Sequence, residues 1–193
     1  MTSNVQIDQY LSGHPGYRGA FPADSLPPNI SPGDSLVVNY DNHNDGGSHW
    51  VAMRFPPDAP VEYFDSFGFA PDADDKILKR KTRFAEYLAE HSFATSAVGT
   101  DSDEVTDADA TDSKNLTDQH LHGVFVYNKT DFQSAESDTC GIWAAWFVLG
   151  ALDNPADLRA LLSMKGAVRD NTVRKIFGSE RDSGTADEPH FDS

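Results

Sequence analysis

The most reactive side chain of this sequence belongs to Cys140, the single cysteine among 193 residues. A cysteine attacks carbonyl carbons as the thiolate. Because a free thiol has a pKa of about 8.5, a nucleophilic cysteine needs a cationic neighbour or a helix N-terminus. Ser137, Asp138 and Thr139 precede it as candidate N-cap residues, and the run 142–152 is apolar throughout. We therefore expect Cys140 in the first turn of a buried helix, although a small unreactive core residue is the alternative.

Three upstream residues have the chemistry to assist a thiolate in acyl transfer. His49 starts the strand-like segment SHWVAMRF, and Asp65 ends a second short strand, VEYFD, 16 positions later. If these strands are adjacent and antiparallel, the carboxylate can orient the imidazole. Gln133 lies seven positions before Cys140, where its amide could receive the charge that develops on a carbonyl oxygen. Singly, an ordinary histidine, a turn aspartate and a surface glutamine would explain these three residues.

Together these motifs resemble the adenovirus endopeptidase (adenain) and the fold-related proteases that remove SUMO and other ubiquitin-like modifiers. The resemblance is carried by His49-Trp50, by FDSFGF around Asp65, by Gln133, and by Cys140-Gly141 with its apolar helix. The seven-position step to the cysteine and the FGF sequence are similar to the adenovirus branch, whereas the aspartate is similar to the deconjugating branch. The match spans roughly residues 8–166 and is specific only at these motifs.

By this resemblance Cys140 is the nucleophile and His49 the general base. Asp65 would orient the base, and Gln133 would donate to the oxyanion. Trp50 would narrow the substrate cleft, or else serve only as a core aromatic. The resemblance implies a cysteine-type endopeptidase (thiol protease) that cleaves at glycine-containing sites. Its expected role is the maturation of precursor proteins of a virus or virus-like element. The alternatives are a ubiquitin-like or SUMO-type deconjugating isopeptidase and a catalytically inactive binding module of the same fold.

Positioning these residues requires strands and helices in one α+β domain. Strands are expected over 35–40, 49–55, 61–64 and 123–127, and helices over 7–11, 74–91, 142–152, 155–164 and 168–177. The segment 13–34, rich in proline and glycine, is expected to be irregular. The expected fold is adenain-like, with a small mixed β-sheet packed against a central helix that carries the nucleophile.

The domain is expected to span residues 1–178. Within it, the acidic low-complexity stretch 95–122 is expected to be a mobile surface insertion. Two alternatives are that this loop gates the substrate cleft or that it binds a basic partner. Residues 179–193 are expected to form a disordered acidic tail. The spacing of cysteine and histidine defines no zinc site, so no metal is expected.

The net charge of −16 at pH 7 bears on partners and cofactors. Because such a field repels phosphate backbones, we expect no nucleic-acid partner, including the DNA cofactor that aids the adenovirus enzyme. That enzyme is also activated by a peptide held through a disulfide to a second cysteine, which this chain lacks. A noncovalent peptide activator stays open, and no other cofactor is expected. The expected partner is a polypeptide substrate, bound by a monomer, and a salty habitat would explain the charge.

The chain shows neither a signal-peptide core nor an apolar run long enough to cross a bilayer. We therefore expect a soluble protein with no membrane association and no signal-peptide secretion. Its expected location is the virion or the host-cell interior if it is viral, and otherwise the cytoplasm. A single cysteine excludes an intramolecular disulfide, which fits a reducing interior.

Overall fold

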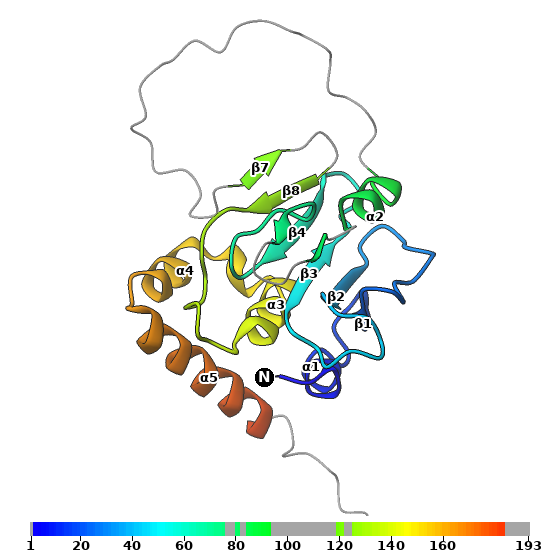
Figure 1. The fold of residues 1–193 in the computed structure, drawn as a ribbon. Helices are drawn as coiled ribbons and strands as arrows, with labels where there is room; N and C mark the ends of the chain where they lie inside the picture. The colour runs from blue at the N-terminus through cyan, green and yellow to red at the C-terminus, as the bar shows by residue number, and fades with distance from the viewer. Residues whose placement is uncertain (1, 76–79, 82–83, 94–118, 122–124, 184–193) are drawn as a thin grey trace, which may run out of the picture.

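A six-stranded mixed sheet forms the centre of the computed structural model, which describes residues 2–75, 80–81, 84–93, 119–121 and 125–183 (Figure 1). In sheet order the strands are β1 (Tyr17–Pro22), β2 (Ser35–Asn39), β3 (Trp50–Arg54), β4 (Val61–Asp65), β8 (Phe125–Asn128) and β7 (Gln119–Leu121). β1 pairs with β2 and β4 pairs with β8 in parallel, while the other pairs are antiparallel. The predicted α+β class with a mixed sheet is confirmed.

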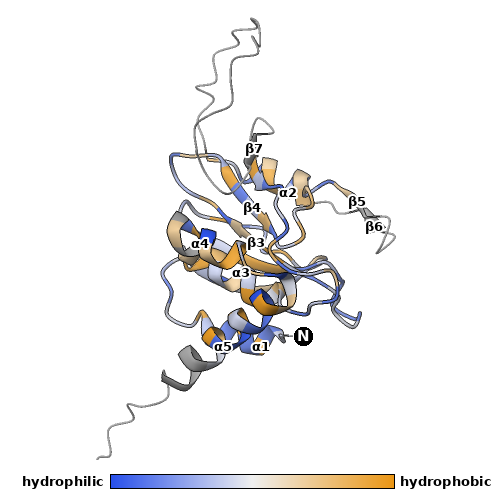
Figure 2. Ribbon diagram, turned by 90° about the vertical axis from the view of Figure 1, so that its left-hand side faces the viewer, coloured by the Kyte–Doolittle hydropathy of each residue, from blue (hydrophilic) through white to orange (hydrophobic). Residues whose placement is uncertain are grey.

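Helices cover both faces of this sheet, as Figure 2 shows. One face carries α1 (Asn4–Tyr10), α3 (Cys140–Val148), α4 (Pro155–Leu162) and α5 (Gly166–Ser183), with the 3-10 helix η1 (Ala151–Asp153) between α3 and α4. The other face carries α2 (Phe84–Glu90). Two short strands, β5 (Asp74–Asp75) and β6 (Arg80–Lys81), form a separate antiparallel pair.

The hydrophobic core is divided in two by the sheet. Side chains of a strand alternate between its faces, so Val37 of β2 packs with the α3 cluster, whereas Leu36 and Val38 pack with the α2 cluster. All nine residues of α3 are buried. A helix that is apolar on every side belongs inside a core, and α3 accordingly lies between the sheet and the helices α1 and α5.

Arg54 joins the sheet to the helical layer. Its guanidinium bonds Glu62 of β4 at 2.6 Å and holds both carboxylate oxygens of Asp153 at 2.9 and 3.0 Å. It also lies 4.2 Å from the ring centre of Phe147 in α3.

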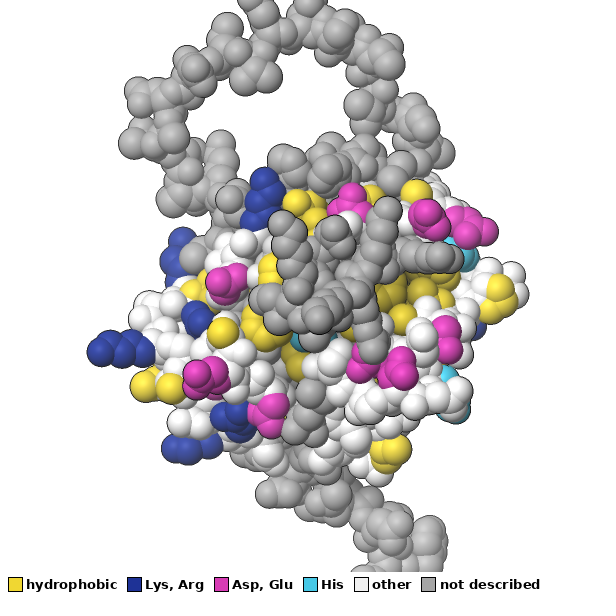
Figure 3. Space-filling model, viewed as in Figure 1, with side chains coloured by type: hydrophobic (Ala, Val, Ile, Leu, Met, Phe, Trp, Pro, Cys, Tyr) yellow, Lys and Arg dark blue, Asp and Glu magenta, His cyan; other side chains and the backbone are white. Residues whose placement is uncertain are grey.

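The charged side chains are unevenly distributed over the surface. On the face seen in Figure 3, Lys and Arg lie mainly on the side of α4 and α5, whereas Asp and Glu occur on both sides.

Two of the sequence predictions need correction in the first half of the chain. The segment expected to be irregular contains β1, which pairs with the first central strand at an edge of the sheet, where its terminal Pro22 needs no ladder donor. The helix expected over 74–91 is wrong in its first half, which holds β5 and β6. Among the described residues of this range, Phe84–Glu90 is helical, because Phe84 and Leu88, one turn apart, attach this segment to the sheet.

The second half of the chain differs from expectation at several boundaries. The helix expected over 142–152 begins at Cys140 and ends at Val148, because Gly150 adopts a left-handed conformation before η1. Residues 119–121, placed by sequence in the acidic insertion, form the edge strand β7 against β8. Helix α5 continues to Ser183, five residues past the expected domain end at 178. The rest of the predicted insertion and of the predicted tail lies outside the described residues. Within the described part of the chain, no helix combines the length and hydropathy that a bilayer span requires.

Candidate active site

Strands β3 and β4 bring His49 and Asp65 together. The strands are adjacent and antiparallel, with Val51 opposite Asp65, and His49 immediately precedes β3. The Nε2 atom of His49 lies 2.9 Å from Oδ1 of Asp65. Both side chains are buried, with 3% of His49 and none of Asp65 exposed. The contact expected from two paired strands is therefore present.

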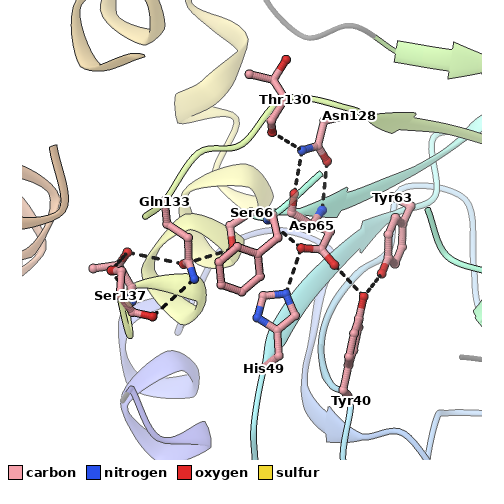
Figure 4. A network of polar contacts seen from close by, with 11 residues as sticks. Tyr40, His49, Tyr63, Asp65, Ser66, Asn128, Thr130, Gln133 and Ser137 are labelled. Carbon is pink, nitrogen blue, oxygen red and sulfur yellow. Dashed lines mark hydrogen bonds and ion pairs between the residues drawn. The ribbon is translucent and has the colours of Figure 1, made fainter. Parts of the chain in front are cut away.

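Several hydrogen bonds hold the Asp65 carboxylate in place (Figure 4). Oδ1 also accepts the backbone N–H of Phe67 at 2.8 Å, and Oδ2 accepts the hydroxyl of Tyr40 at 2.5 Å. Burial, then the charges of Tyr63 and Asp65, raises the pKa of Tyr40 well above its usual value, so this hydroxyl stays a donor. The Tyr40 and Tyr63 hydroxyl oxygens lie 3.0 Å apart. Each oxygen of the buried carboxylate thus has a donor, as burial of a charge requires.

Cys140 is the first residue of α3 and is only 2% exposed. Burial lowers the pKa of His49, but the charge and hydrogen bond of Asp65, followed by the hydrogen bond and charge of Cys140, raise this pKa to about 10. Because Nε2 of His49 faces Asp65, the other ring nitrogen is available to Cys140. A pKa of about 10 favours the imidazolium form of His49 at neutral pH.

Gln133 is buried, with 3% of its surface exposed, so it is not the surface glutamine of the alternative explanation. Its Oε1 accepts the hydroxyl of Ser66 at 3.2 Å, and its Nε2 donates to the carbonyl of Ser137 at 3.4 Å. An amide nitrogen carries two N–H groups. The second one is suited to a developing oxyanion, provided that the amide keeps this orientation.

The N-cap of α3 is one of the three candidates predicted from the sequence. Thr139 is the N-cap residue, but its hydroxyl makes no capping hydrogen bond. Its Oγ1 lies 3.5 Å from Oε1 of Gln133 and 3.3 Å from Oδ1 of Asp170, a buried residue of α5. The Ser134 hydroxyl donates to the other oxygen of Asp170 at 2.5 Å. These side chains hold the loop before the nucleophile instead of closing the helix end.

Trp50 contacts the start of α3 and also lines a pocket. Its indole N–H donates to the carbonyl of Thr2 at 2.8 Å. A Cβ placed on Gly141 would lie 3.2 Å from Trp50 Cδ1 and 2.9 Å from Thr2 Cβ. Trp50 also forms part of the wall of a pocket of about 390 Å³, together with Asn39 and Asp41. Trp50 is therefore both a core aromatic and a wall of this pocket, whose lining includes none of the other predicted site residues.

Sequence reasoning missed four residues around the site: Tyr40, Ser66, Phe67 and Asn128. The Phe67 ring stacks on the His49 ring at 4.9 Å between centres. The Asn128 side chain binds the backbone N–H and C=O of Asp65 at 2.9 and 2.6 Å. Ser66 and Phe67 belong to the FDSFGF motif and could have been found there, whereas Tyr40 and Asn128 arrive only through strand pairing.

Among the described residues, no group of three or more histidine, cysteine or acidic side chains is placed to hold a metal ion. In comparisons with known proteins, no protein-family model and no curated protein matches this chain.

Proposed function

We propose that this protein is a cysteine endopeptidase with Cys140 as nucleophile and His49 as the proton-transfer group. The observation that carries the proposal is the buried line of contacts from Asp65 through His49 to Cys140. A nucleophile, a base and an orienting acid within reach of one another are the arrangement that acyl-transfer enzymes share on unrelated folds. The resemblance of the four motifs to adenain-like proteases supports the same chemistry and the same fold.

The first half-reaction forms a thioester. The Cys140 thiolate attacks the peptide carbonyl carbon, and the oxygen becomes an oxyanion that Gln133 Nε2 and the backbone N–H of Cys140 receive. The imidazolium of His49 then protonates the leaving amine as the C–N bond breaks.

The second half-reaction hydrolyses this thioester. His49, now neutral, takes a proton from water, and the oxygen of that water attacks the thioester carbonyl. Collapse of the intermediate releases the carboxylic acid product and restores the thiolate beside the imidazolium. Asp65 accepts from Nε2 throughout, so it keeps the ring oriented and stabilises its charged form.

The substrate that fits best is a polypeptide with glycine next to the cleaved bond. Cys140 is only 2% exposed, so the thiol is closely surrounded by the protein. A segment without side chains can approach such a closed site more easily than a bulky one. The family resemblance implies the same preference, and the biological role we propose is precursor maturation in a virus or virus-like element.

A second candidate is removal of ubiquitin-like modifiers from conjugates. The feature that favours it is the orienting acid, since the aspartate at position 65 resembles the deconjugating branch. Deconjugation requires a surface that binds the folded modifier, whereas maturation requires only a short motif. Cleavage of folded modifier fusions at a kcat/KM far above that of short Gly-Gly peptides would favour this candidate.

Hydrolysis of fluorogenic peptides with glycine on the acyl side of the cleaved bond tests the proposal. Cys140→Ala and His49→Ala are expected to lose activity by roughly 10⁴-fold or more, because nucleophile and base act as a unit. His14→Ala, outside the site, is the matched control and should retain full activity. Turnover that survives in Cys140→Ala, or a wild-type thiol that no peptide-based thiol probe labels, would overturn the assignment.

A further inference from the structure

Two adjacent buried residues at the end of β4 serve different parts of the site. Asp65 binds His49, and Ser66 donates its hydroxyl to Oε1 of Gln133 at 3.2 Å. Neither side chain is exposed. The backbone carbonyl of Ser66 also accepts the N–H groups of Phe132 at 2.8 Å and of Gln133 at 3.3 Å. Ser66 therefore contacts Gln133 through both its side chain and its main chain (Figure 4).

We propose that Ser66 is a positioning residue that sets the orientation of the Gln133 amide, so that Nε2 and not Oε1 is presented to the substrate oxyanion. This inference rests on the proposed function. The two ends of an amide are nearly equal in size but opposite in hydrogen-bonding character. A reversed amide would present an acceptor to a negatively charged oxygen and would oppose the reaction instead of assisting it.

The surrounding groups favour one orientation. The Ser137 carbonyl, 3.4 Å from Nε2, can only accept, so it requires the nitrogen at its end of the amide. At the other end, Oε1 has the hydroxyls of Ser66 and Thr139 within reach. Thr139 is farther away, at 3.5 Å, and its single proton has a second acceptor in Asp170 at 3.3 Å. Ser66 is therefore the main donor to Oε1.

Kinetics of Ser66→Ala test this role. Removing an oxyanion donor outright lowers kcat by roughly 10²–10³-fold, so a loosened donor should lower it by about 10- to 100-fold, with KM within about twofold. Alkylation of Cys140 by iodoacetamide should stay within about twofold of wild type, because the thiolate displaces iodide from an sp³ carbon and no oxyanion forms. A merely structural role would disturb Cys140 and His49 and lower both rates together.

Two further variants complete the kinetic test. Ser35→Ala is the matched control, because it also removes a buried serine hydroxyl, one without a hydrogen-bond partner among the described residues. It should leave kcat unchanged. Ser66→Thr keeps a hydroxyl at the same place and should retain more kcat than Ser66→Ala. An unchanged kcat in Ser66→Ala, or an equal loss of kcat and alkylation rate, would overturn the proposal.

NMR of the Gln133 side-chain amide separates this inference from the protease assignment. Its two N–H signals can be identified by their disappearance in Gln133→Glu, and in wild type they should exchange slowly with solvent. Ser66→Ala should accelerate that exchange by at least tenfold, and Ser35→Ala should not. If wild type hydrolyses no peptide but the exchange responds, the protease assignment fails and the positioning role stands. If peptides are hydrolysed and neither exchange nor kcat responds, only the positioning role fails.

Discussion

Neutralising Asp65 should convert His49 from a charged to an uncharged side chain at neutral pH. In the wild type, burial lowers the pKa of His49, and Asp65 and Cys140 raise it to about 10, against 6.5 for a free histidine. That difference corresponds to about 5 kcal/mol, at about 1.4 kcal/mol for each pKa unit. In Asp65→Asn the carboxylate is lost while the burial remains. The His49 pKa should then fall to 6.5 or below.

The sign of the stability change follows from the same pKa. A raised folded-state pKa stabilises the native protein fully below pH 6.5, and this contribution is lost as the pH rises towards 10. Asp65→Asn should therefore have a lower free energy of unfolding than the wild type. This difference should be largest below pH 6.5 and should become smaller as the pH rises towards 10. Activity at pH 7 should fall by roughly 10⁴-fold, as it does when the acid of other triads becomes an amide.

The assay is an NMR pH titration of the imidazole ¹⁵N signals, with His49 identified by comparison with His49→Gln. Urea unfolding at several pH values gives the stability difference. Asp58→Asn, which removes an exposed carboxylate between β3 and β4, is the control and should leave the His49 midpoint unchanged. An identical His49 midpoint in wild type and Asp65→Asn would refute the electrostatic argument.

Two more properties can be predicted from the packing and from the charge. Gly141→Ala places a Cβ 2.9 Å from Thr2 Cβ and 3.2 Å from Ile7 Cδ1, so it should cost about 1–3 kcal/mol in urea unfolding. Gly178→Ala, with open space around its added Cβ in α5, should instead stabilise by about 1 kcal/mol, and equal effects of the two changes would contradict this packing. The net charge of −16 predicts a melting temperature and an activity that rise between 0.1 M and 1 M NaCl, as screening shortens the Debye length from about 10 to 3 Å. An activity maximum at low ionic strength would contradict a salt-adapted surface.

The central strands and the nucleophile helix could be predicted because their local patterns agree with their surroundings. β3 and β4 are short apolar runs bounded by turn residues, and α3 is apolar throughout. The contact of His49 with Asp65 followed from their spacing across one antiparallel connection. Fold class and this contact were therefore accessible from local sequence alone.

The features that sequence did not reveal depend on pairing between distant segments. β1 was predicted to be irregular because its glycine and proline are typical of turns. It is a strand because its backbone pairs with that of β2. Tyr40 and Asn128 contact Asp65 because strand pairing brings their segments beside it, and no local sequence pattern predicts either contact. Thr139, one of three N-cap candidates, takes the N-cap position of α3. Its hydroxyl nevertheless contacts Gln133 and Asp170 instead of capping the helix, because tertiary partners compete with local ones.

The position of α3 has a consequence for biosynthesis. Every other residue of the proposed machinery precedes Cys140 in the chain, and His49 does so by 91 positions. The sheet is therefore translated before Cys140, whereas α4 and α5, which pack in the same core cluster as α3, are translated after it. Because all nine residues of α3 are buried, the contacts of Cys140 in the proposed site require the whole domain to be folded around this helix.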